Sequence, residues 1–517
     1  MVVGADDEMS NSDRRNGETQ DSNPPSLDLT DDAMHELVTE SVALIADYFG
    51  HIAEIPLFQH TAASKFADEL SSELPIEGES IEQLMKDCRS LISATRHTGH
   101  PRFLGYIGSV STPVGAFADA IASTLNPNVN SWRSAPAATE LEKLVVRWLG
   151  LLVGYGENAQ GLLTSGSSMA NLNALLIAHR VKSPEKVSEK GLWNTGAPMT
   201  IYASDRVHFS IPKAADVLGL GRDCVRIVKS DAKFRLEVSS LRQRIEADLS
   251  NGFRPFCIVA NAGTTATGAV DPLAEIARVA EEYQLWLHVD GAYGAFAALD
   301  PRKRHLFAGI ELADSVSLDP HKWLYTPVDC GCLLFRNAAE VRTALSFGVG
   351  EFLQLHEETE AESFAFWDYG IELSRRFRAL KIWMLLRYYG VRRISAAIAN
   401  NNTLAEYLGD RVSMAEDFEL LAPVELSICC FRYVPPLLVT RLLSGDETER
   451  ASVNAEIDRL NARILFAVQR KGRAYLSNTT ICGRYALRAC TVNFRTTCAD
   501  IDAILDIVRD TAHNLDK

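Results

Sequence analysis

The sequence predicts an α/β protein built on a mostly parallel central sheet. Short apolar segments alternate with amphipathic segments through the middle of the chain, and buried strands separated by crossover helices give this pattern. The predicted strands are Met199–Ala203, Cys224–Val228, Phe256–Asn261, Leu285–Val289, Ser315–Leu318 and Gly331–Phe335. The clearest helices between them are predicted at Val238–Leu249 and Pro272–Tyr283.

The regions on either side of this sheet differ in character. The predicted parts of the chain are a disordered tail at 1–27, a helical N-terminal segment at 28–110, a large domain at 111–395 and a small α+β domain at 396–517. The tail is polar and acidic. The helical segment repeats apolar residues at helical spacing but has a weak core of its own, which favours packing on something else, such as a second subunit. Strands at Ser427–Tyr433 and Ala486–Asn493 belong to the small domain.

Charge and composition exclude several classes of protein. The chain has 517 residues, of which 52 are basic and 67 acidic, so its formal net charge is −15. A generally basic nucleic-acid binder is excluded by this balance. No uncharged stretch resembles a membrane-spanning helix, and the N-terminus lacks the apolar core of a secretory signal. The ten cysteines show no paired CxxC metal spacing, so we expect no metal and a reducing, cytoplasmic location.

Two charged residues stand where strands are predicted to end. Lys322 closely follows a buried strand in SLDPHKW (317–323), and Asp290 ends the strand in LWLHVDGAYG (285–294). Lys322 is either a surface lysine after a turn or a partly desolvated amine suited to Schiff-base chemistry. Asp290 is either a helix cap or a fixed negative charge for a protonated pyridine nitrogen. Ligands bind at this edge of open α/β sheets, which favours the chemical alternatives.

Two further features complete a possible cofactor site. Ser167 and Ser168 precede a helix predicted at Leu172–Arg180, and free backbone N–H groups at such a position suit a phosphate. A helix that is capped without any ligand is the alternative. His208 follows the Met199–Ala203 strand and either stacks on a flat ring or is structural. Together these groups are the parts of a pyridoxal-phosphate enzyme.

Longer runs carry a resemblance to one family. The chain resembles the group II pyridoxal-phosphate-dependent amino-acid decarboxylases, nearest the aromatic-L-amino-acid decarboxylase branch. The matching runs are HPRFLGYIG (100–108), SWRSAPAATELE (131–142), LLTSGSSMANLNALL (162–176), NAGTTATGAVDP (261–272), LWLHVDGAYG (285–294), SLDPHKW (317–323), LSRRFRALKIW (373–383) and LRACTVNFRTT (487–497). The resemblance implies the fold-type I architecture, pyridoxal 5′-phosphate, an amino-acid substrate and an obligate homodimer with active sites at the subunit interface.

The resemblance also implies roles for individual residues. Lys322 would form the Schiff base, Asp290 would pair with the pyridinium nitrogen and Ala292 would pack on the ring. His208 would stack on the opposite face and act in proton transfer. Ser167, Ser168 and Asp319 would hold the phosphate. Thr264 would lie close to the cofactor, and His321 would also belong to the cofactor-binding residues.

One position departs from the family pattern. Phe352 aligns with a loop tyrosine that donates a proton in the decarboxylases, and a phenyl ring has no proton to donate. In plant relatives this change accompanies aldehyde synthases, which release an aldehyde, ammonia and peroxide. The nearby His356 is an alternative proton donor, and a different alignment of the loop is a third explanation. We expect decarboxylation to the amine, with aldehyde synthesis as the alternative.

The predicted substrate pocket is more polar than in the aromatic branch. Bulky apolar groups of relatives are replaced by Thr98, Ile107, Asn128 and Asn130, while Ser374 matches a serine that accompanies phenolic substrates. Ser109 would contact the substrate carboxylate. We expect tyrosine or DOPA as substrate, with a smaller acidic amino acid as the alternative. Cleavage like that of the sphingosine-phosphate lyases fits the motifs less well, and an inactive binding protein is disfavoured because Lys322 and Asp290 are both present.

Overall fold

The computed structural model describes residues 27–58, 63–70, 74–183, 187–192, 196–346, 359 and 362–515. The chain divides into two compact units. The first comprises the chain up to Gly50 together with Ser72–Leu91, and the second comprises His51–Ser71 and the chain from Ile92 onward. The tail predicted at 1–27 lies, except for its last residue, outside the described residues.

The first unit is a pair of helices, as the sequence predicted. They are α1 (Asp31–His51) and α3 (Ile81–Ala94). Arg89 pairs with Glu40 at 2.9 Å, and the Ser41 hydroxyl donates to the Met85 sulfur at 3.8 Å. Neither helix has a buried residue. Two helices that bury so little apolar surface contribute little to their own stability.

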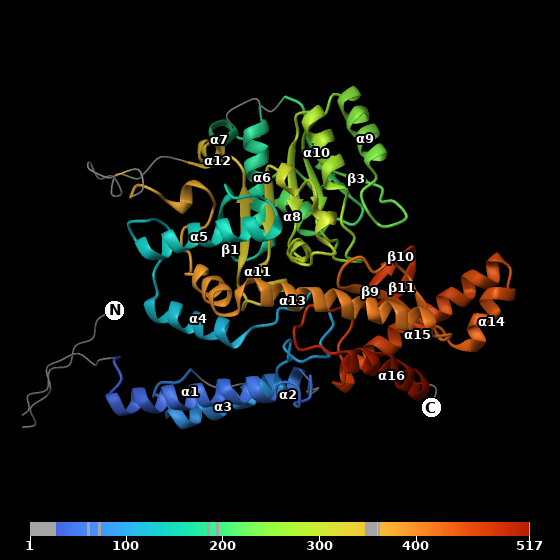
Figure 1. Ribbon diagram of the computed structural model, residues 1–517, viewed down its shortest axis with the longest axis horizontal. Coiled ribbons are helices and arrows are strands. Elements are labelled where there is room, and N and C mark those ends of the chain that lie inside the picture. The colour runs from blue at the N-terminus through green and yellow to red at the C-terminus, as the bar shows by residue number, and fades with distance from the viewer. Residues whose placement is uncertain are drawn as a thin grey trace, which may run out of the picture. The chain divides into compact units, whose positions relative to one another are not determined.

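A seven-stranded sheet forms the centre of the second unit (Figure 1). Its strands, in spatial order, are β1 (Gln160–Thr164), β7 (Gly331–Phe335), β6 (Ser315–Leu318), β5 (Trp286–Asp290), β4 (Arg254–Asn261), β2 (Met199–Ser204) and β3 (Val225–Val228). Neighbours pair in parallel except at β7, which is antiparallel to both β1 and β6. The predicted mostly parallel sheet is therefore confirmed, with β1 as a strand that the sequence analysis missed.

Two hydrophobic clusters cover opposite faces of this sheet. Successive strand residues point to opposite faces, so on β4 Ile258 joins one cluster while Cys257 and Val259 join the other. On the Ile258 face the sheet packs against α5 (Pro136–Val153), α9 (Val238–Ser250) and α10 (Leu273–Glu282). On the other face it packs against α6 (Ser167–Lys182), α8 (Ser210–Val217) and α12 (Ala338–Leu345).

Some predicted boundaries were wrong. Helix α6 begins at Ser167, five residues before the predicted start, because its polar first turn carries no apolar periodicity. Cys224 lies in a 3₁₀ turn and not in β3. Further 3₁₀ turns among the described residues are Ala295–Leu299, Arg304–Phe307, Ile310–Leu312 and Phe366–Asp368. Further helices described there are α2 (Ala63–Leu70), α4 (Pro113–Leu125), α7 (Val187–Lys190) and α11 (Pro320–Trp323).

The C-terminal part is α+β, as expected. An antiparallel sheet runs β10 (Ser477–Ile481), β11 (Arg484–Cys490), β9 (Ile428–Tyr433) and β8 (Phe418–Leu420), and its helices are α14 (Pro436–Ser444), α15 (Glu447–Lys471) and α16 (Cys498–Leu515). The long helix α13 (Ala379–Met414) spans the boundary predicted after residue 395 and is kinked at Gly390, where φ is 71°. The division into large and small domains stays a prediction. Within the described ranges, no helix is long and apolar enough to cross a bilayer.

A buried ion pair joins β1 to the segment that precedes α13. Arg375 donates to Glu142 on α5, and both side chains are fully buried. The Arg375 guanidinium also donates to the carbonyl oxygens of Val129 at 2.6 Å and Leu163 at 2.8 Å. Glu142 accepts the Leu163 N–H at 2.8 Å. These contacts fix β1, and therefore the loop that leads from it into α6.

We expect Glu142→Leu to destabilise the fold by about 3–5 kcal/mol, because it leaves the buried Arg375 guanidinium without its counter-charge. The midpoint of urea unfolding measures the change. Glu140→Leu is the matched control: Glu140 is on the same helix but its side chain is 56% exposed, so its loss should cost less than about 1 kcal/mol. Equal midpoints for the two variants would contradict a structural role for the buried pair.

Candidate active site

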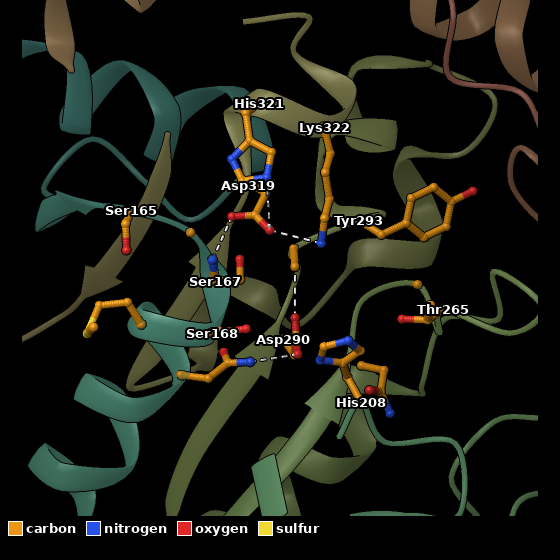
Figure 2. A pocket seen from close by; sticks show the side chains of 16 residues that line it. Ser165, Ser167, Ser168, His208, Thr265, Asp290, Tyr293, Asp319, His321 and Lys322 are labelled. Atoms are coloured by element: carbon orange, nitrogen blue, oxygen red, sulfur yellow. Dashed lines mark hydrogen bonds and ion pairs between the residues drawn. The ribbon is translucent and has the colours of Figure 1, made fainter. Parts of the chain in front are cut away.

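A cavity of about 320 Å³ opens at the carboxyl ends of the parallel strands (Figure 2). Asp290 is the last residue of β5, Asp319 directly follows β6 and His208 follows β2. The first turn of α6, which follows β1, supplies Ser167 and Ser168. The topology thus brings together side chains that are far apart in the sequence, at the edge where open α/β sheets bind ligands.

Lys322 is held by a buried carboxylate. Its Nζ lies 2.9 Å from Oδ2 of Asp319, and Oδ1 of Asp319 accepts the Ser167 N–H at 2.7 Å (Figure 2). Burial by itself would raise the pKa of Asp319, but the charges of Lys322 and His321 and the hydrogen bonds to the carboxylate lower it overall. Asp319 is therefore an anion. Since an anion repels phosphate, its contacts favour a role in positioning Lys322 and Ser167 over the direct phosphate contact expected from the sequence.

The first turn of α6 fits a phosphate group. The Ser167 Oγ is buried and has no hydrogen-bond partner among the described residues, although buried hydroxyls are normally paired. Ser168 also lines the cavity. A helix N-terminus attracts anions through its backbone N–H groups and dipole. An unpaired hydroxyl at such a position is explained if a phosphate oxygen accepts its hydrogen bond.

Asp290 is fixed by three donors. Asn171 Nδ2 donates to its Oδ2 at 2.9 Å, and the Ala292 N–H and the Ser317 hydroxyl donate to its Oδ1 at 3.1 and 3.4 Å. Asp290 is 7% exposed, and Ala292 lines the same cavity. A carboxylate held in this way can stand opposite a protonated ring nitrogen, as the sequence predicts.

His208 lines the cavity as a neutral ring. The backbone N–H of Ser210 donates to its Nδ1 at 3.3 Å, and the Ser210 hydroxyl lies 2.8 Å from the same atom. Because a backbone N–H only donates, Nδ1 is an acceptor and the ring proton is on Nε2. Burial lowers the pKa of His208 from its usual value. His321 also lines the cavity, with Nδ1 lying 2.8 Å from the Cys330 carbonyl oxygen, and burial lowers its pKa too.

Some predicted residues lie elsewhere. The Thr264 hydroxyl contacts Thr267 Oγ1 at 3.0 Å and accepts from the Ala269 N–H at 3.1 Å inside a buried turn, and its neighbour Thr265 lines the cavity. Ile107 lines an adjoining cavity that also contains His208 and Lys322. Among the described residues, the lining of these two cavities does not include Thr98, Ser109, Asn128, Asn130 or Ser374. Phe352 and His356 lie outside the described residues.

The sequence analysis missed Arg488, which lines the adjoining cavity from β11. Arg488 is 3% exposed and donates to the carbonyl oxygens of Thr265 at 2.9 Å and Tyr106 at 2.6 Å, but its Nη2 has no partner among the described residues. An arginine between the apolar residues Leu487 and Ala489 of a strand was the signal in the sequence. Asn171, which contacts Asp290, was also missed, because an asparagine in a helix carries no chemical signature of its own.

This fold and site define a pyridoxal-phosphate enzyme, and comparisons with known proteins agree. Residues 64–434 match the pyridoxal-dependent decarboxylase conserved domain, and the chain belongs to this family. It is 33% identical to an aromatic-L-amino-acid decarboxylase of Bacillus atrophaeus over 95% of this chain and 97% of that protein. It is 32% identical to a phenylacetaldehyde synthase of Petunia hybrida over 91% of this chain and 92% of that protein.

A solved structure gives the same assignment. The crystal structure of Oryza sativa TDC with PLP and tryptamine superposes with a TM-score of 0.85 at 27% identity, covering 95% of this chain and all of that one. The predicted fold-type I architecture is confirmed. The protein is a carboxy-lyase, and pyridoxal 5′-phosphate is its cofactor.

We expect Ser167→Ala to weaken binding of pyridoxal phosphate about 10- to 100-fold, because one hydrogen bond to a charged group is lost. Equilibrium titration of the protein freed of cofactor measures the affinity. Ser183→Ala, at the opposite end of α6, is the control and should bind normally. Pyridoxal, which lacks the phosphate, should bind both variants as it binds the unaltered protein. An equal loss for pyridoxal would show that Ser167 does not contact the phosphate.

Proposed function

We propose that this enzyme removes the α-carboxyl group of an aromatic L-amino acid, tyrosine or DOPA, and releases the amine and CO₂. One observation carries the proposal: the Lys322 amine and the Asp290 carboxylate line a single cavity, next to one lined by Arg488, whose Nη2 has no hydrogen-bond partner among the described residues. An amine for covalent attachment, an anion for a ring nitrogen and a cation for a carboxylate are the three groups that this reaction needs. The family and the similarity to an aromatic-amino-acid decarboxylase support it.

The chain's own residues have distinct parts in the reaction. Bound pyridoxal phosphate supplies a conjugated ring that accepts the electron pair left on the α-carbon as CO₂ departs. Asp290 holds a negative charge beside the ring nitrogen. Asp319 holds the Lys322 amine in the cavity, 2.9 Å from its own carboxylate. Arg488 Nη2 is available for the substrate carboxylate, and His208 carries a proton on Nε2.

We also propose that the enzyme acts as a homodimer. In α1 the apolar residues Met34, Val38 and Val42 are each 44–52% exposed, and in α3 Leu84 and Leu91 are similarly exposed. They recur every four residues in α1, which gives an apolar stripe that the described residues leave about half exposed. Asn128 and Ser374 are exposed and absent from the cavity lining, which fits substrate contacts made across a subunit interface.

We expect light scattering after size exclusion to give twice the 56.9 kDa chain mass. Val38→Glu combined with Val42→Glu should shift the mass to that of one chain, since charges in an apolar interface are costly. Glu36→Lys is the control on the same helix. A single-chain mass for the unaltered protein would reject the dimer.

A cytoplasmic location is proposed because all ten cysteines are free thiols.

Aldehyde synthesis is the second candidate, because the sequence analysis aligns Phe352 with the loop tyrosine of the decarboxylases and the chain resembles phenylacetaldehyde synthases almost as closely as decarboxylases. In that reaction amino acid, O₂ and water give aldehyde, CO₂, ammonia and hydrogen peroxide. In decarboxylation a proton donor turns the electron pair on the α-carbon into a C–H bond. In aldehyde synthesis O₂ takes up these two electrons and becomes hydrogen peroxide.

We expect aerobic incubation with L-tyrosine or L-DOPA to give CO₂ and amine in equal amounts without peroxide. L-tryptophan, L-phenylalanine and L-glutamate should react more slowly. Lys322→Ala is the control and should lose turnover at least about 10³-fold, because the covalent attachment of the cofactor is lost. Peroxide and aldehyde in step with CO₂ would replace amine formation by aldehyde synthesis, and Phe352→Tyr should then restore amine. Activity on none of the aromatic substrates would reject the proposal.

A further inference from the structure

Asn171 joins three polar groups beneath the cavity. Its two amide N–H groups point at Asp290 Oδ2, at 2.9 Å, and at Ser210 Oγ, at 3.0 Å. Its Oδ1 lies 2.9 Å from Nε2 of His288. Asn171 is 1% exposed. Every polar atom of its side chain therefore has a partner.

The direction of these hydrogen bonds follows from the Asp290 carboxylate, which lies at one end of the series and can only accept. An ionised Asp290 carboxylate accepts, so the Asn171 atom beside it is the NH₂ group and the atom beside His288 is the amide oxygen. His288 Nε2 must then carry a proton. Its Nδ1 accepts from the Ser315 hydroxyl, 2.9 Å away, and Ser315 Oγ accepts in turn from the indole N–H of Trp286 at 2.9 Å. Trp286 can only donate, so both ends of this branch agree.

A second branch runs from Asn171 to His208. Ser210 Oγ accepts from Asn171, so its own proton is free to go to His208 Nδ1, 2.8 Å away. The Ser210 backbone N–H donates to the same nitrogen. Both contacts make Nδ1 an acceptor and leave the proton of His208 on Nε2. Asn171 thus fixes the carboxylate on one side and, through Ser210, the tautomer of the cavity histidine on the other.

The surroundings of the network favour a fixed arrangement. His288 and Ser315 are fully buried, and burial lowers the pKa of His288 to about 4, so it is neutral at physiological pH and has one N–H to donate. Removing the central amide would take away the hydrogen bond that Asn171 makes to each of Asp290 Oδ2, His288 Nε2 and Ser210 Oγ, in a site of low dielectric.

We propose that Asn171 is a positioning residue that orients the Asp290 carboxylate toward the cofactor ring and, through Ser210, holds His208 as the Nε2–H tautomer. This inference deepens the proposed function and rests on it, in that Asp290 and His208 must face the ring. The Asn171 side chain then orients both Asp290 and His208, which would contact different parts of the cofactor. Its loss should therefore alter how the ring is held even when the protein remains folded.

The test compares two substitutions at Asn171 with a control on the same helix. Asn171→Leu keeps the volume and removes all three hydrogen bonds, whereas Asn171→Asp keeps the shape and an oxygen acceptor but removes the two donors. Asn173→Leu is the control: Asn173 is also fully buried on α6, but its Oδ1 accepts the Ile371 N–H, and it does not line the cavity. The readouts are the affinity for pyridoxal phosphate, the circular dichroism of the bound cofactor's visible band, and the thermal midpoint of the cofactor-free protein.

We expect both Asn171 variants to bind the cofactor about 10-fold or more weakly and to lose at least about half of the circular dichroism per bound cofactor, since hydrogen bonds to a charged group are lost. Asn173→Leu should change neither the affinity for the cofactor nor the circular dichroism per bound cofactor. If Asn171→Asp behaves like the unaltered protein, only shape matters and the inference is overturned. Circular dichroism that is equal in the Asn171 and Asn173 variants overturns it as well. Failure of the unaltered protein to bind the cofactor would instead reject the proposed function.

Discussion

The ion pair between Lys322 and Asp319 is the contact around which the site is arranged. Asp319 follows β6, accepts the first N–H of α6 and holds the Lys322 amine, so one carboxylate ties the sheet, the anion-binding helix and the reactive amine together. Asp319 and Asp290 line the same cavity because β5 and β6 run parallel and end at one edge of the sheet. A strand reversed at this point would place Asp319 and Asp290 at opposite ends of the sheet.

Satisfied and unsatisfied polar groups divide the site into two functional parts. Beneath the cavity, the network from Trp286 through His288 and Asn171 to Asp290 is fully paired and rigid. In two residues that line the cavities, Ser167 Oγ and Arg488 Nη2 are buried and have no hydrogen-bond partner within the part of the chain that the structure describes. Buried polar atoms without partners are costly. The unpaired atoms are at Ser167 and Arg488, where we propose that a phosphate and a carboxylate bind. The paired atoms surround Asp290, whose carboxylate has only to be held in place.

Bond cleavage and product choice are decided by different parts of the chain. The groups that would favour loss of CO₂ are set on the sheet and on α6, which are rigid elements. The fate of the electron pair on the α-carbon depends on whether a proton or O₂ reaches it first. Phe352 and His356, which the sequence analysis associates with this choice, lie outside the described residues, and the relatives include both a decarboxylase and an aldehyde synthase.

The sequence alone determined the fold class, six of the seven strands of the central sheet and the residues Lys322, Asp290, His208, Ser167 and Ser168. It could do so because buried parallel strands are continuous apolar runs, and because charges at their ends are conspicuous. The short strand β1 escaped prediction, since it is held by the distant Arg375–Glu142 pair and not by its own pattern.

Only the tertiary structure decided the parts of Asn171, Arg488 and Asp319. Asparagine and arginine have no periodic or motif signature, and their functions arise from partners on other elements, which for Asn171 lie 39 to 119 residues away in the chain. The contact of Asp290 with Asn171 joins strand β5 to helix α6, and that of Arg488 joins β11 to the loop after β4. Such contacts depend on packing between elements, which local sequence does not encode.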